Sequence, residues 1–222
     1  RTWEDPAVRA VIVCAETDRH ESLVVPAAAA GRDLFVEKPL GYAAADAFRM
    51  ADAIERAGVR FQTGYFMRGD PAHCFLRAQV RAGTFGRLTR GRFANGHMGA
   101  IKGWFDTEWR WMADPARAGC GAYGDLGTHS LDLALWLMGE VESATAVTGS
   151  ALGRYPGCDE FGEGLLAFRS GAVAAVAASW VDTANPVSLQ LFGTEGTATV
   201  RGGQLFIESP NLPGADGRSP WS

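Results

Sequence analysis

The sequence predicts an α/β part followed by an α+β part. In residues 1–63, short apolar runs alternate with helical segments, a rhythm typical of parallel strands joined by right-handed crossovers. From residue 64 to residue 209, strand-like runs follow one another with short turns and few helical segments, as in a mostly antiparallel sheet. Residues 210–222 are rich in Pro, Gly, Ser and Asp without periodicity, so we expect a loose tail there.

The first part reads as strand, helix, strand, helix, strand. Val11-Ile12-Val13 is a short continuous apolar run, which is typical of a strand covered on both faces. Gly31 and Gly58 each follow a helical segment, where a glycine commonly ends a helix. We expect strands at residues 11–13, 34–36 and 59–62, and helices at residues 21–31 and 43–57. This order predicts a doubly wound parallel sheet.

The second part carries most of its expected strands after residue 140. We expect helices at residues 71–82 and 128–138, and strands at residues 87–95, 141–150, 164–168, 172–180, 188–192, 197–200 and 204–207. The segment Phe168–Ala172 joins two of these strands by a short hairpin turn. Strands with such short connections pair antiparallel.

The composition argues against several classes of protein. Hydrophobic residues make up 47% and charged residues 21%, which is ordinary for a globular protein in water and argues against disorder. The net charge of -4 and the lack of a Lys/Arg cluster speak against nucleic-acid binding. No apolar run reaches the length of a membrane span. The cysteines have no C-x-x-C spacing, so we expect free thiols in a reducing cytoplasm and neither a zinc site nor a disulfide framework.

Glu37-Lys38-Pro39 directly follows the expected strand 34–36. Ligands of open α/β sheets lie beyond the carboxyl ends of the strands, which places Lys38 at a binding edge. Pro39 fixes its own φ and biases Lys38 away from the helical region, which restricts the direction of the lysine side chain. An ammonium there could polarise an alcohol or carbonyl oxygen, or exchange a proton with it. The residues alone fit a surface turn stiffened by proline equally well.

A second group of polar residues lies at the start of an expected helix. If that helix begins near Asp125, then Asp125, His129 and Asp132 lie on one face. A carboxylate one turn from an imidazole can orient it, fix its tautomer and raise its proton affinity. A structural histidine is an equally good interpretation of the residues alone. One histidine with two carboxylates could also bind a divalent ion, but no further ligand follows at motif spacing, so we expect no metal.

The segment 119–124, Gly-Cys-Gly-Ala-Tyr-Gly, matches the G-x-G-x-x-G dinucleotide-binding fingerprint letter for letter. That fingerprint works only where a hydrophobic strand leads into the turn. The preceding residues 109–118 include Asp114-Pro115 and two arginines, which is not a buried strand. We therefore interpret the match as accidental, and the glycines as a flexible approach to the helix that carries Asp125 and His129.

These residues together resemble the Gfo/Idh/MocA family, named for glucose-fructose oxidoreductase and inositol dehydrogenase. Gly31–Leu40 is similar to the family's strand and E-K-P signature, and Gly121–His129 to its G-x-x-x-D-x-G-x-H helix start. Gln62–Arg68 resembles the opening of its second domain, and Gly83–Leu88 the turn into its large sheet. The resemblance covers nearly the whole chain.

The resemblance implies a domain organisation. Residues 1–63 would be the C-terminal part of a Rossmann-type parallel sheet, a dinucleotide-binding domain that lacks its first strands. Residues 64–209 would form the domain for substrate binding and oligomerisation. The family's first strand and its true G-x-G-x-x-G turn would precede Arg1, so we expect a piece of a longer protein, truncated at both ends. Without the pyrophosphate-binding turn, the 222 residues are expected to bind cofactor poorly.

The resemblance also implies a reaction. We expect hydride transfer between NAD or NADP and a sugar, polyol or related hydroxyl substrate, because no protein side chain accepts a hydride. Lys38 would hydrogen-bond the reacting hydroxyl, His129 would exchange its proton, and Asp125 would position substrate and imidazole. Contacts with the cofactor are implied for Glu37, Lys38, His20, Gln62 and Arg68. Contacts with the substrate are implied for His97, Trp104, Arg110, Asp125 and His129. The family also implies a homo-oligomer, a dimer or a tetramer.

Polar and aromatic side chains that suit sugar hydroxyls and ring faces lie just before the second group; they are Arg92, His97, Trp104, Phe105, Trp109 and Arg110. A surface loop with core aromatics explains each of them singly as well. Two other functions stay open: a catalytically idle binding member of the family, and a glycosidase-like enzyme that uses NAD transiently. The intact Lys38, Asp125 and His129 argue against an idle member.

Overall fold

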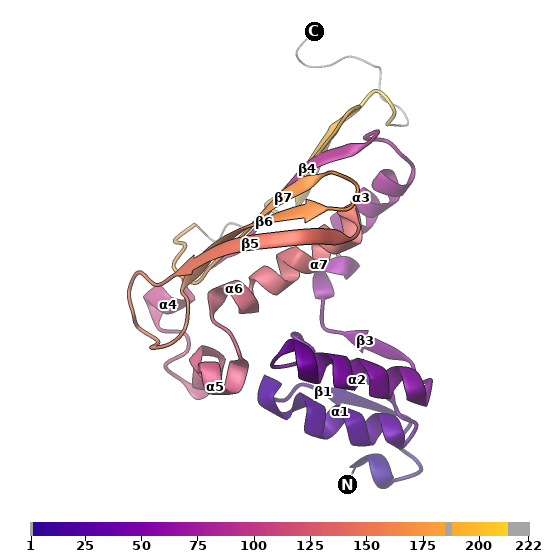
Figure 1. Cartoon of the computed structure of the whole chain (residues 1–222), viewed down its shortest axis with the longest axis vertical. Helices are drawn as coiled ribbons and strands as arrows, with labels where there is room; N and C mark the ends of the chain where they lie inside the picture. Colours follow the sequence, from indigo (N-terminus) through magenta and orange to yellow (C-terminus); the bar gives the residue numbers. More distant parts are fainter. Residues whose placement is uncertain (1, 185–187, 213–222) are drawn as a thin grey trace.

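The computed structural model describes residues 2–184 and 188–212, which form two parts (Figure 1). A small parallel sheet with two helices lies at the N-terminal end, and a long seven-stranded sheet with its own helices forms the rest. This arrangement confirms the predicted α/β part followed by an α+β part with a mostly antiparallel sheet.

The small sheet has the strand order β1-β2-β3, and all its strands are parallel, as predicted. Its strands are β1 (Ala10–Val13), β2 (Asp33–Val36) and β3 (Phe61–Thr63), connected by α1 (His20–Ala29) and α2 (Ala44–Ala57). Two 3₁₀ turns, η1 (Thr2–Glu4) and η2 (Thr17–Arg19), precede β1 and α1. α2 ends at Gly58, whose φ of 63° lies in the left-handed region that favours glycine.

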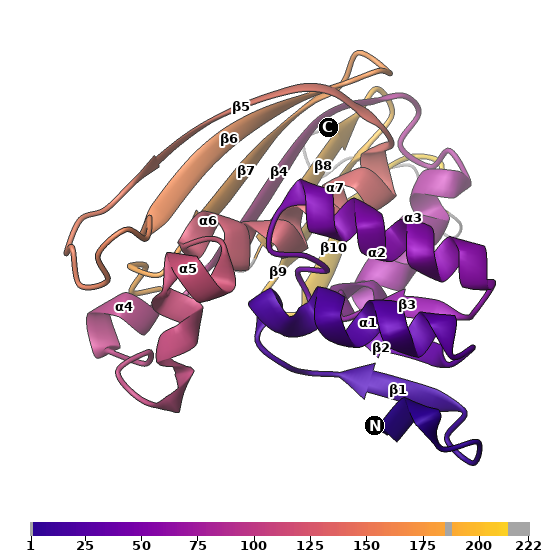
Figure 2. The same cartoon turned by 60° about the horizontal axis from the view of Figure 1, so that its bottom comes forward.

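The two helices lie together on one face of the small sheet (Figure 2). Val13, Leu34 and Val36 are buried against them and form the core of this part. On the other face, Ile12 is 71% exposed, so the predicted cover on both faces is wrong for the described residues. Two consecutive right-handed crossovers that move in the same direction place both helices on the same side of a parallel sheet.

The large sheet has the strand order β10-β9-β8-β4-β7-β6-β5. Its neighbouring strands are antiparallel except for β4 and β7, which are parallel. The strands are β4 (Leu88–Gly96), β5 (Val141–Gly149), β6 (Phe161–Phe168), β7 (Val173–Ser179), β8 (Ser188–Gly193), β9 (Thr197–Arg201) and β10 (Gln204–Glu208). The predicted hairpin turn joins β6 to β7, with Gly171 at a φ of 84°.

Two predicted helices, α3 (Pro71–Arg81) and α7 (Gly127–Met138), lie against the face of the large sheet that is turned toward the small part (Figures 1 and 2). α7 packs on β4 and β7, and its Leu133 and Leu137 are buried among residues of these strands. Several short helices were not predicted: η3 (Phe66–Gly69), α4 (Gly99–Lys102), η4 (Glu108–Ala113), α5 (Pro115–Ala118) and α6 (Ala122–Asp125). Of these, α4, η4, α5 and α6 lie between β4 and α7, and α5 contacts η2 of the small part (Figure 2).

β6 begins at Phe161, three residues before its predicted start at residue 164. Gly162 and Gly164 hid this part of the strand, because glycine lowers the strand tendency of a sequence. The ring of Tyr123 occupies the space that a side chain at either glycine would need. The glycines therefore allow α6 to pack directly on the sheet.

The predicted loose tail is only partly described. Residues 210–212 form a turn, in which Asn211 Nδ2 donates to Thr84 O at 3.4 Å, so this end of the tail is attached to the sheet domain. The remaining tail residues, 213–222, lie outside the described residues. None of the helices in the described residues has the length and apolar character needed to cross a bilayer.

Candidate functional site

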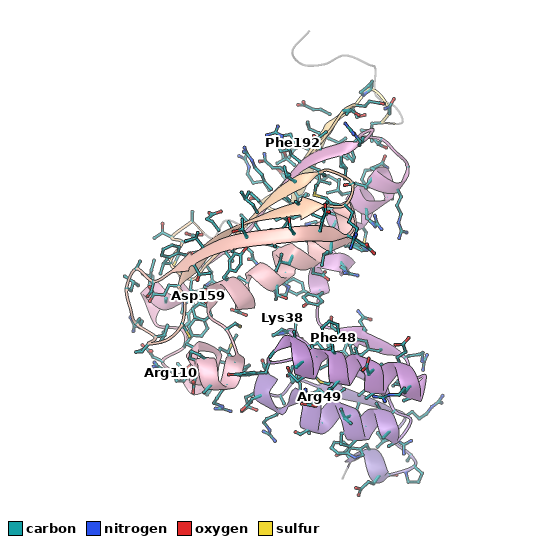
Figure 3. The ribbon with its side chains drawn as sticks, in the orientation of Figure 1. Lys38, Phe48, Arg49, Arg110, Asp159 and Phe192 are labelled. Atoms are coloured by element: carbon teal, nitrogen blue, oxygen red, sulfur yellow. The ribbon has the colours of Figure 1, made fainter. Side chains whose placement is uncertain are left out.

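Lys38 and Asp125 come from the two parts of the chain and meet between them. Lys38 Nζ donates to Asp125 Oδ1 at 2.6 Å and to the Asp125 backbone oxygen at 3.2 Å. The side chains are 16% and 12% exposed, so water competes little for the contact. Figure 3 shows Lys38 on the side of the small part that is turned toward the large sheet. The two residue groups that the sequence singled out are thus neighbours in space.

The carboxyl ends of β2 and β3 hold Lys38 and its neighbour Glu37. The Lys38 backbone N–H donates to Glu37 Oε2 at 3.0 Å, which turns the glutamate toward the end of β3. A side chain at Gly64 would place its Cβ 2.6 Å from Glu37 Oε2, so the carboxylate occupies space that only glycine leaves open. Both acidic and basic groups therefore lie at the edge where ligands of parallel sheets bind.

Asp125 is the last residue of the short helix α6. Asp159 fixes the first turn of this helix, since the Tyr123 backbone N–H donates to Asp159 Oδ2 at 2.7 Å. Figure 3 shows Asp159 on the large-sheet side of this region. The second oxygen of Asp125, Oδ2, accepts from the indole Nε1 of Trp180 at 3.1 Å. Each carboxylate oxygen of Asp125 therefore has its own donor.

Asp125, His129 and Asp132 do not lie on one continuous helix. α6 ends at Asp125 and α7 begins at Gly127, and the one residue between them, Leu126, has a helical backbone conformation. Asp132 faces Arg68 instead and accepts from it at 2.8 and 2.6 Å. Within the described residues, neither carboxylate hydrogen-bonds His129, so orientation of the imidazole by a carboxylate stays a prediction.

His129 lies in an apolar environment beside this pair. Its ring meets Phe66 edge-on, with the ring centres 5.3 Å apart, and its Nδ1 is buried with no hydrogen-bond partner among the described residues. Burial, reinforced by the Lys38 ammonium and partly opposed by Asp125, lowers the pKa of His129 to about 4. The predicted rise in proton affinity is therefore wrong, because burial outweighs the carboxylate. The imidazole is neutral at physiological pH.

Two cavities meet at Glu37 and Lys38, which line both of them. The first, of about 410 Å³, extends to Gln62 and His129. The second, of about 310 Å³, is lined by Asp125 and by the apolar side chains of Trp109, Trp111 and Met112. A third cavity of about 770 Å³, between α3, α7 and the large sheet, contains none of the three predicted catalytic residues. The chemistry-bearing groups therefore gather around Lys38, at the junction of the two smaller cavities.

Two predicted cofactor contacts have other partners. His20 is buried, and its ring nitrogens lie 3.0 Å from Leu40 O and 3.1 Å from Ala15 O. This histidine joins two backbone segments, and each of its ring nitrogens already has a backbone partner. Arg68 is held by Asp132 and lies 5.6 Å from the centre of the Trp136 ring, which removes it from the cavity around Lys38. Gln62, in contrast, lines that cavity as predicted for a ligand contact.

Three of the predicted substrate contacts, His97, Trp104 and Arg110, have different surroundings. Burial lowers the pKa of His97, with Asp125 opposing the shift, and its ring lies 4.9 Å from that of Trp104. Arg110 pairs with Asp106 at 3.4 Å and covers the ring of Tyr155 at 4.9 Å. Figure 3 shows Arg110 on the outer side of the α5 region, away from Lys38. His97 therefore lies near Asp125 with Trp104 beside it, whereas Arg110 is engaged by Asp106 and Tyr155.

Trp180 is the site residue that the sequence did not reveal. The sequence predicted only that this residue ends the strand at residues 172–180. One general signal could have found it: a buried tryptophan needs an acceptor for its indole N–H. In the described ranges, no group of three or more His, Cys, Asp or Glu side chains could hold a metal ion.

The glycine match at residues 119–124 is not a dinucleotide turn. The helix α5, not a strand, leads into it. Gly119 has a φ of 79° and approaches the backbone of Tyr42, and Gly121 approaches Asp159. These glycines allow close packing between segments, which confirms that the fingerprint match is accidental.

A parallel sheet with polar groups at its carboxyl edge, set against an antiparallel sheet domain, defines a two-part nucleotide-binding class of fold. Comparison with known families agrees. Residues 1–65 match the profile of the oxidoreductase family with an NAD-binding Rossmann fold, and residues 74–199 match the GFO/IDH/MocA C-terminal domain. The chain belongs to the GFO/IDH/MocA family.

Individual relatives are similar over most of this chain. The scyllo-inositol 2-dehydrogenase (NAD(+)) of Bacillus subtilis is 26% identical over 97% of this chain and 61% of its own length. An NAD binding oxidoreductase from Klebsiella pneumoniae has a similar structure, with a TM-score of 0.87, 28% identity, and coverage of 94% of this chain and 58% of that one. Levoglucosan dehydrogenase, solved with NADH and levoglucosan, gives a TM-score of 0.86 and 25% identity over 93% and 58% of the two chains. The chain spans less than two thirds of the length of these relatives.

Proposed function

We propose that the protein is an NAD(P)-dependent oxidoreductase that transfers a hydride between a nicotinamide cofactor and a sugar, polyol or related hydroxyl substrate. One observation carries the proposal: the Lys38 ammonium, fixed 2.6 Å from Asp125 at the carboxyl edge of the parallel sheet, shares a cavity with the neutral His129. The names of the relatives, which include an inositol dehydrogenase and a levoglucosan dehydrogenase, support the substrate class.

The three side chains have different parts in this reaction. Lys38 donates a hydrogen bond to the reacting hydroxyl and stabilises the negative charge that develops on its oxygen. His129 accepts the hydroxyl proton, and its pKa of about 4 makes the imidazolium a strong proton donor in the reverse direction. Asp125 accepts from Lys38 and holds the ammonium between the two cavities, so its first task is to position the lysine.

The chain's residues fit the nicotinamide half of a dinucleotide. A bound nicotinamide ring supplies the acceptor or donor of the hydride. The Glu37 carboxylate, exposed to both cavities, can accept hydrogen bonds from a ribose, and Gln62 can bond the same end of the cofactor. His129 Nδ1 is a buried polar atom without a partner among the described residues, which suits a site that a ligand completes. His97 and Trp104 are the proposed substrate contacts from the large-sheet part.

An activity assay tests this proposal. A form of the protein that binds cofactor is mixed with NAD or NADP and a panel of cyclitols, pyranoses, glycosides and open-chain polyols, and reduced cofactor is followed by its absorbance. We expect reduction with at least one member of the panel and a product two mass units lighter than the substrate. Cleavage of a glycoside without net reduction would indicate the glycosidase-like alternative. Cofactor binding with no turnover on any substrate would indicate an idle member.

We also propose that residues 1–63 bind the cofactor, and that residues 64–209 bind substrate and form a homo-oligomer. The face of the large sheet that carries no helix exposes Leu165 and Val173, and the edge strand β5 is exposed along nearly its whole length. A dimer or tetramer formed through this face would bury them. Light scattering should show Leu165→Glu as a smaller particle than wild type, with Leu152→Glu, outside the sheet, as control. Equal masses for wild type and Leu165→Glu would contradict this interface.

The cytoplasm is the proposed location, because all four cysteines are free thiols.

A further inference from the structure

Trp180 is a fully buried residue with a polar group aimed at the site. Its side chain has 0% exposure, and its indole Nε1 donates to Asp125 Oδ2 at 3.1 Å. A buried N–H without an acceptor is costly, so the indole and the carboxylate hold each other in place. The contact links the residue that follows β7 of the large sheet to Asp125, which binds Lys38 beyond the end of β2.

The indole is more firmly held than the carboxylate. The Trp180 backbone N–H donates to Glu160 O at 2.8 Å, and its carbonyl accepts from the Ala100 N–H at 2.9 Å. The ring packs against Phe105, with ring centres 4.5 Å apart, and meets Tyr155 edge-on at 6.5 Å. In this aromatic cluster, side chains from several elements fix the ring by packing. The direction of the indole N–H therefore does not depend on its contact with Asp125.

Trp180 and Lys38 each donate to a different oxygen of the Asp125 carboxylate. Trp180 binds Oδ2 and leaves Oδ1 for the Lys38 ammonium at 2.6 Å. In the described residues, no other side chain donates to Oδ2. Without the indole N–H, the carboxylate is free to turn about its terminal torsion, and the ammonium bound to it moves as well.

We propose that Trp180 is a positioning residue: its indole N–H fixes the Asp125 carboxylate and thereby the place of the Lys38 ammonium between the two cavities. Its effect on turnover rests on the proposed function. Its effect on the positions of Asp125 and Lys38 does not depend on any activity.

Nuclear magnetic resonance of the labelled full chain tests the positional claim without substrate. The sequence contains seven tryptophans and two lysines, Lys38 and Lys102, so the indole N–H and lysine Cε signals are few. Trp180→Phe identifies the Trp180 signal, which should exchange slowly with solvent and move in Asp125→Asn. The Lys38 Cε signal should shift in Trp180→Phe while that of Lys102 stays in place. The proposal would be overturned if the Trp180 indole signal does not move in Asp125→Asn, or if the Lys38 Cε signal does not move in Trp180→Phe.

A matched variant separates the hydrogen bond from the packing. Phe105→Leu disturbs the same aromatic cluster but leaves the indole N–H in place, so the Trp180 signal should stay slow to exchange and remain sensitive to Asp125→Asn. Loss of both properties in Phe105→Leu would show that general packing, and not the hydrogen bond, controls the site.

Kinetics test the catalytic consequence in a form of the protein that turns over substrate. Trp180→Phe should lower kcat by about 10- to 100-fold, because a displaced ammonium no longer meets the reacting oxygen, while KM for the cofactor changes by less than about threefold. In an Asp125→Asn background the same change should add less than about twofold, since the group through which Trp180 acts is gone. Full additivity would overturn the positioning role. If no substrate turns over, the proposed function fails, and the resonance experiment still decides the positional claim.

Discussion

Lys38 Nζ lies 2.6 Å from Asp125 Oδ1, and this contact joins the two parts of the chain across 87 residues of sequence. Arg117 and Glu16 also bridge the parts, at 2.8 Å, but that arginine is 41% exposed against 16% for Lys38. A surface ion pair contributes little to stability, whereas breaking a buried pair leaves a charge without a partner. We therefore expect the Lys38–Asp125 contact to govern function and the Arg117 contact to matter little.

Asp125 and Asp132 are matched acidic residues with different expected effects. Asp125→Asn removes the negative charge beside Lys38, so turnover should fall by about 100-fold or more. Asp132→Asn weakens the pair with Arg68, so the free energy of unfolding should fall by about 1–3 kcal/mol while turnover stays within a few-fold. Urea unfolding and cofactor reduction, measured on both variants, check this contrast. Equal losses of turnover would contradict the separate roles.

His129 should make stability depend on pH. Its pKa is about 4 in the folded protein, against 6.5 for an ordinary histidine, so the unfolded chain binds more protons between these values. This contribution to stability is fully present above pH 6.5 and is lost as the pH falls toward 4. Between pH 7.5 and pH 5 it should amount to about 2 kcal/mol. Urea unfolding should show that the free energy of unfolding of wild type falls by this amount more than that of His129→Gln over the same pH range. An equal dependence on pH in the two proteins would contradict the prediction.

Glu160 is a buried carboxylate that organises the loop before β6. Its oxygens accept from the backbone N–H groups of Ala151 at 2.7 Å, Leu152 at 2.6 Å and Arg154 at 3.0 Å. Burial alone would raise the pKa of Glu160, but these three donors together outweigh it and lower the pKa. The resulting stability is present above the ordinary glutamate pKa of 4.5 and is lost as the pH falls below it.

Glu160→Gln should therefore lower the free energy of unfolding by about 2–4 kcal/mol at neutral pH, because an amide offers one acceptor oxygen where the carboxylate offers two. Glu163→Gln, at an exposed position of β6, is the control and should change it by less than about 0.5 kcal/mol. A loss below about 1 kcal/mol in Glu160→Gln would show that the loop does not need the charge.

Gly64 leaves the space in which the Glu37 carboxylate lies. Gly64→Ala would place a Cβ 2.6 Å from Glu37 Oε2 and displace that carboxylate from the cavity edge. We expect cofactor affinity to fall by about tenfold with the fold retained. Gly69→Ala, where nothing lies within 4 Å of the added Cβ, is the control. Calorimetric titration with NAD compares the two variants in a form of the protein that binds the cofactor, and unchanged affinity in Gly64→Ala would remove Glu37 from the proposed cofactor contacts.

The sequence predicts the small sheet and the long helices because their signals are local. Apolar runs at Val11-Ile12-Val13 and before Lys38 identify the strands, and glycines such as Gly58 identify helix ends. The start of β6 is not predicted because Gly162 and Gly164 have low strand tendency. They are glycines because the ring of Tyr123, which is distant in sequence, occupies the space of their missing side chains. Local patterns do not record what a glycine makes room for.

The site was predictable in its residues but not in its partners. Lys38, Asp125 and His129 follow from the resemblance, yet no hydrogen bond joins Asp125 to His129 in the described residues. The partners of Asp125 are Lys38, 87 residues earlier, and Trp180, 55 residues later. Such contacts depend on how two sheets meet, and helical spacing within one segment cannot reveal them.

The most direct test of the proposed function compares the two lysines of the sequence. Lys38→Met and Lys102→Met each remove one ammonium, and only Lys38 lies at the junction of the two cavities. With substrate and NAD at saturation, kcat of Lys38→Met should fall by at least about 100-fold, while Lys102→Met should keep kcat within about twofold of wild type. Near-normal turnover in a folded Lys38→Met would contradict the assignment of hydride-transfer chemistry to this site.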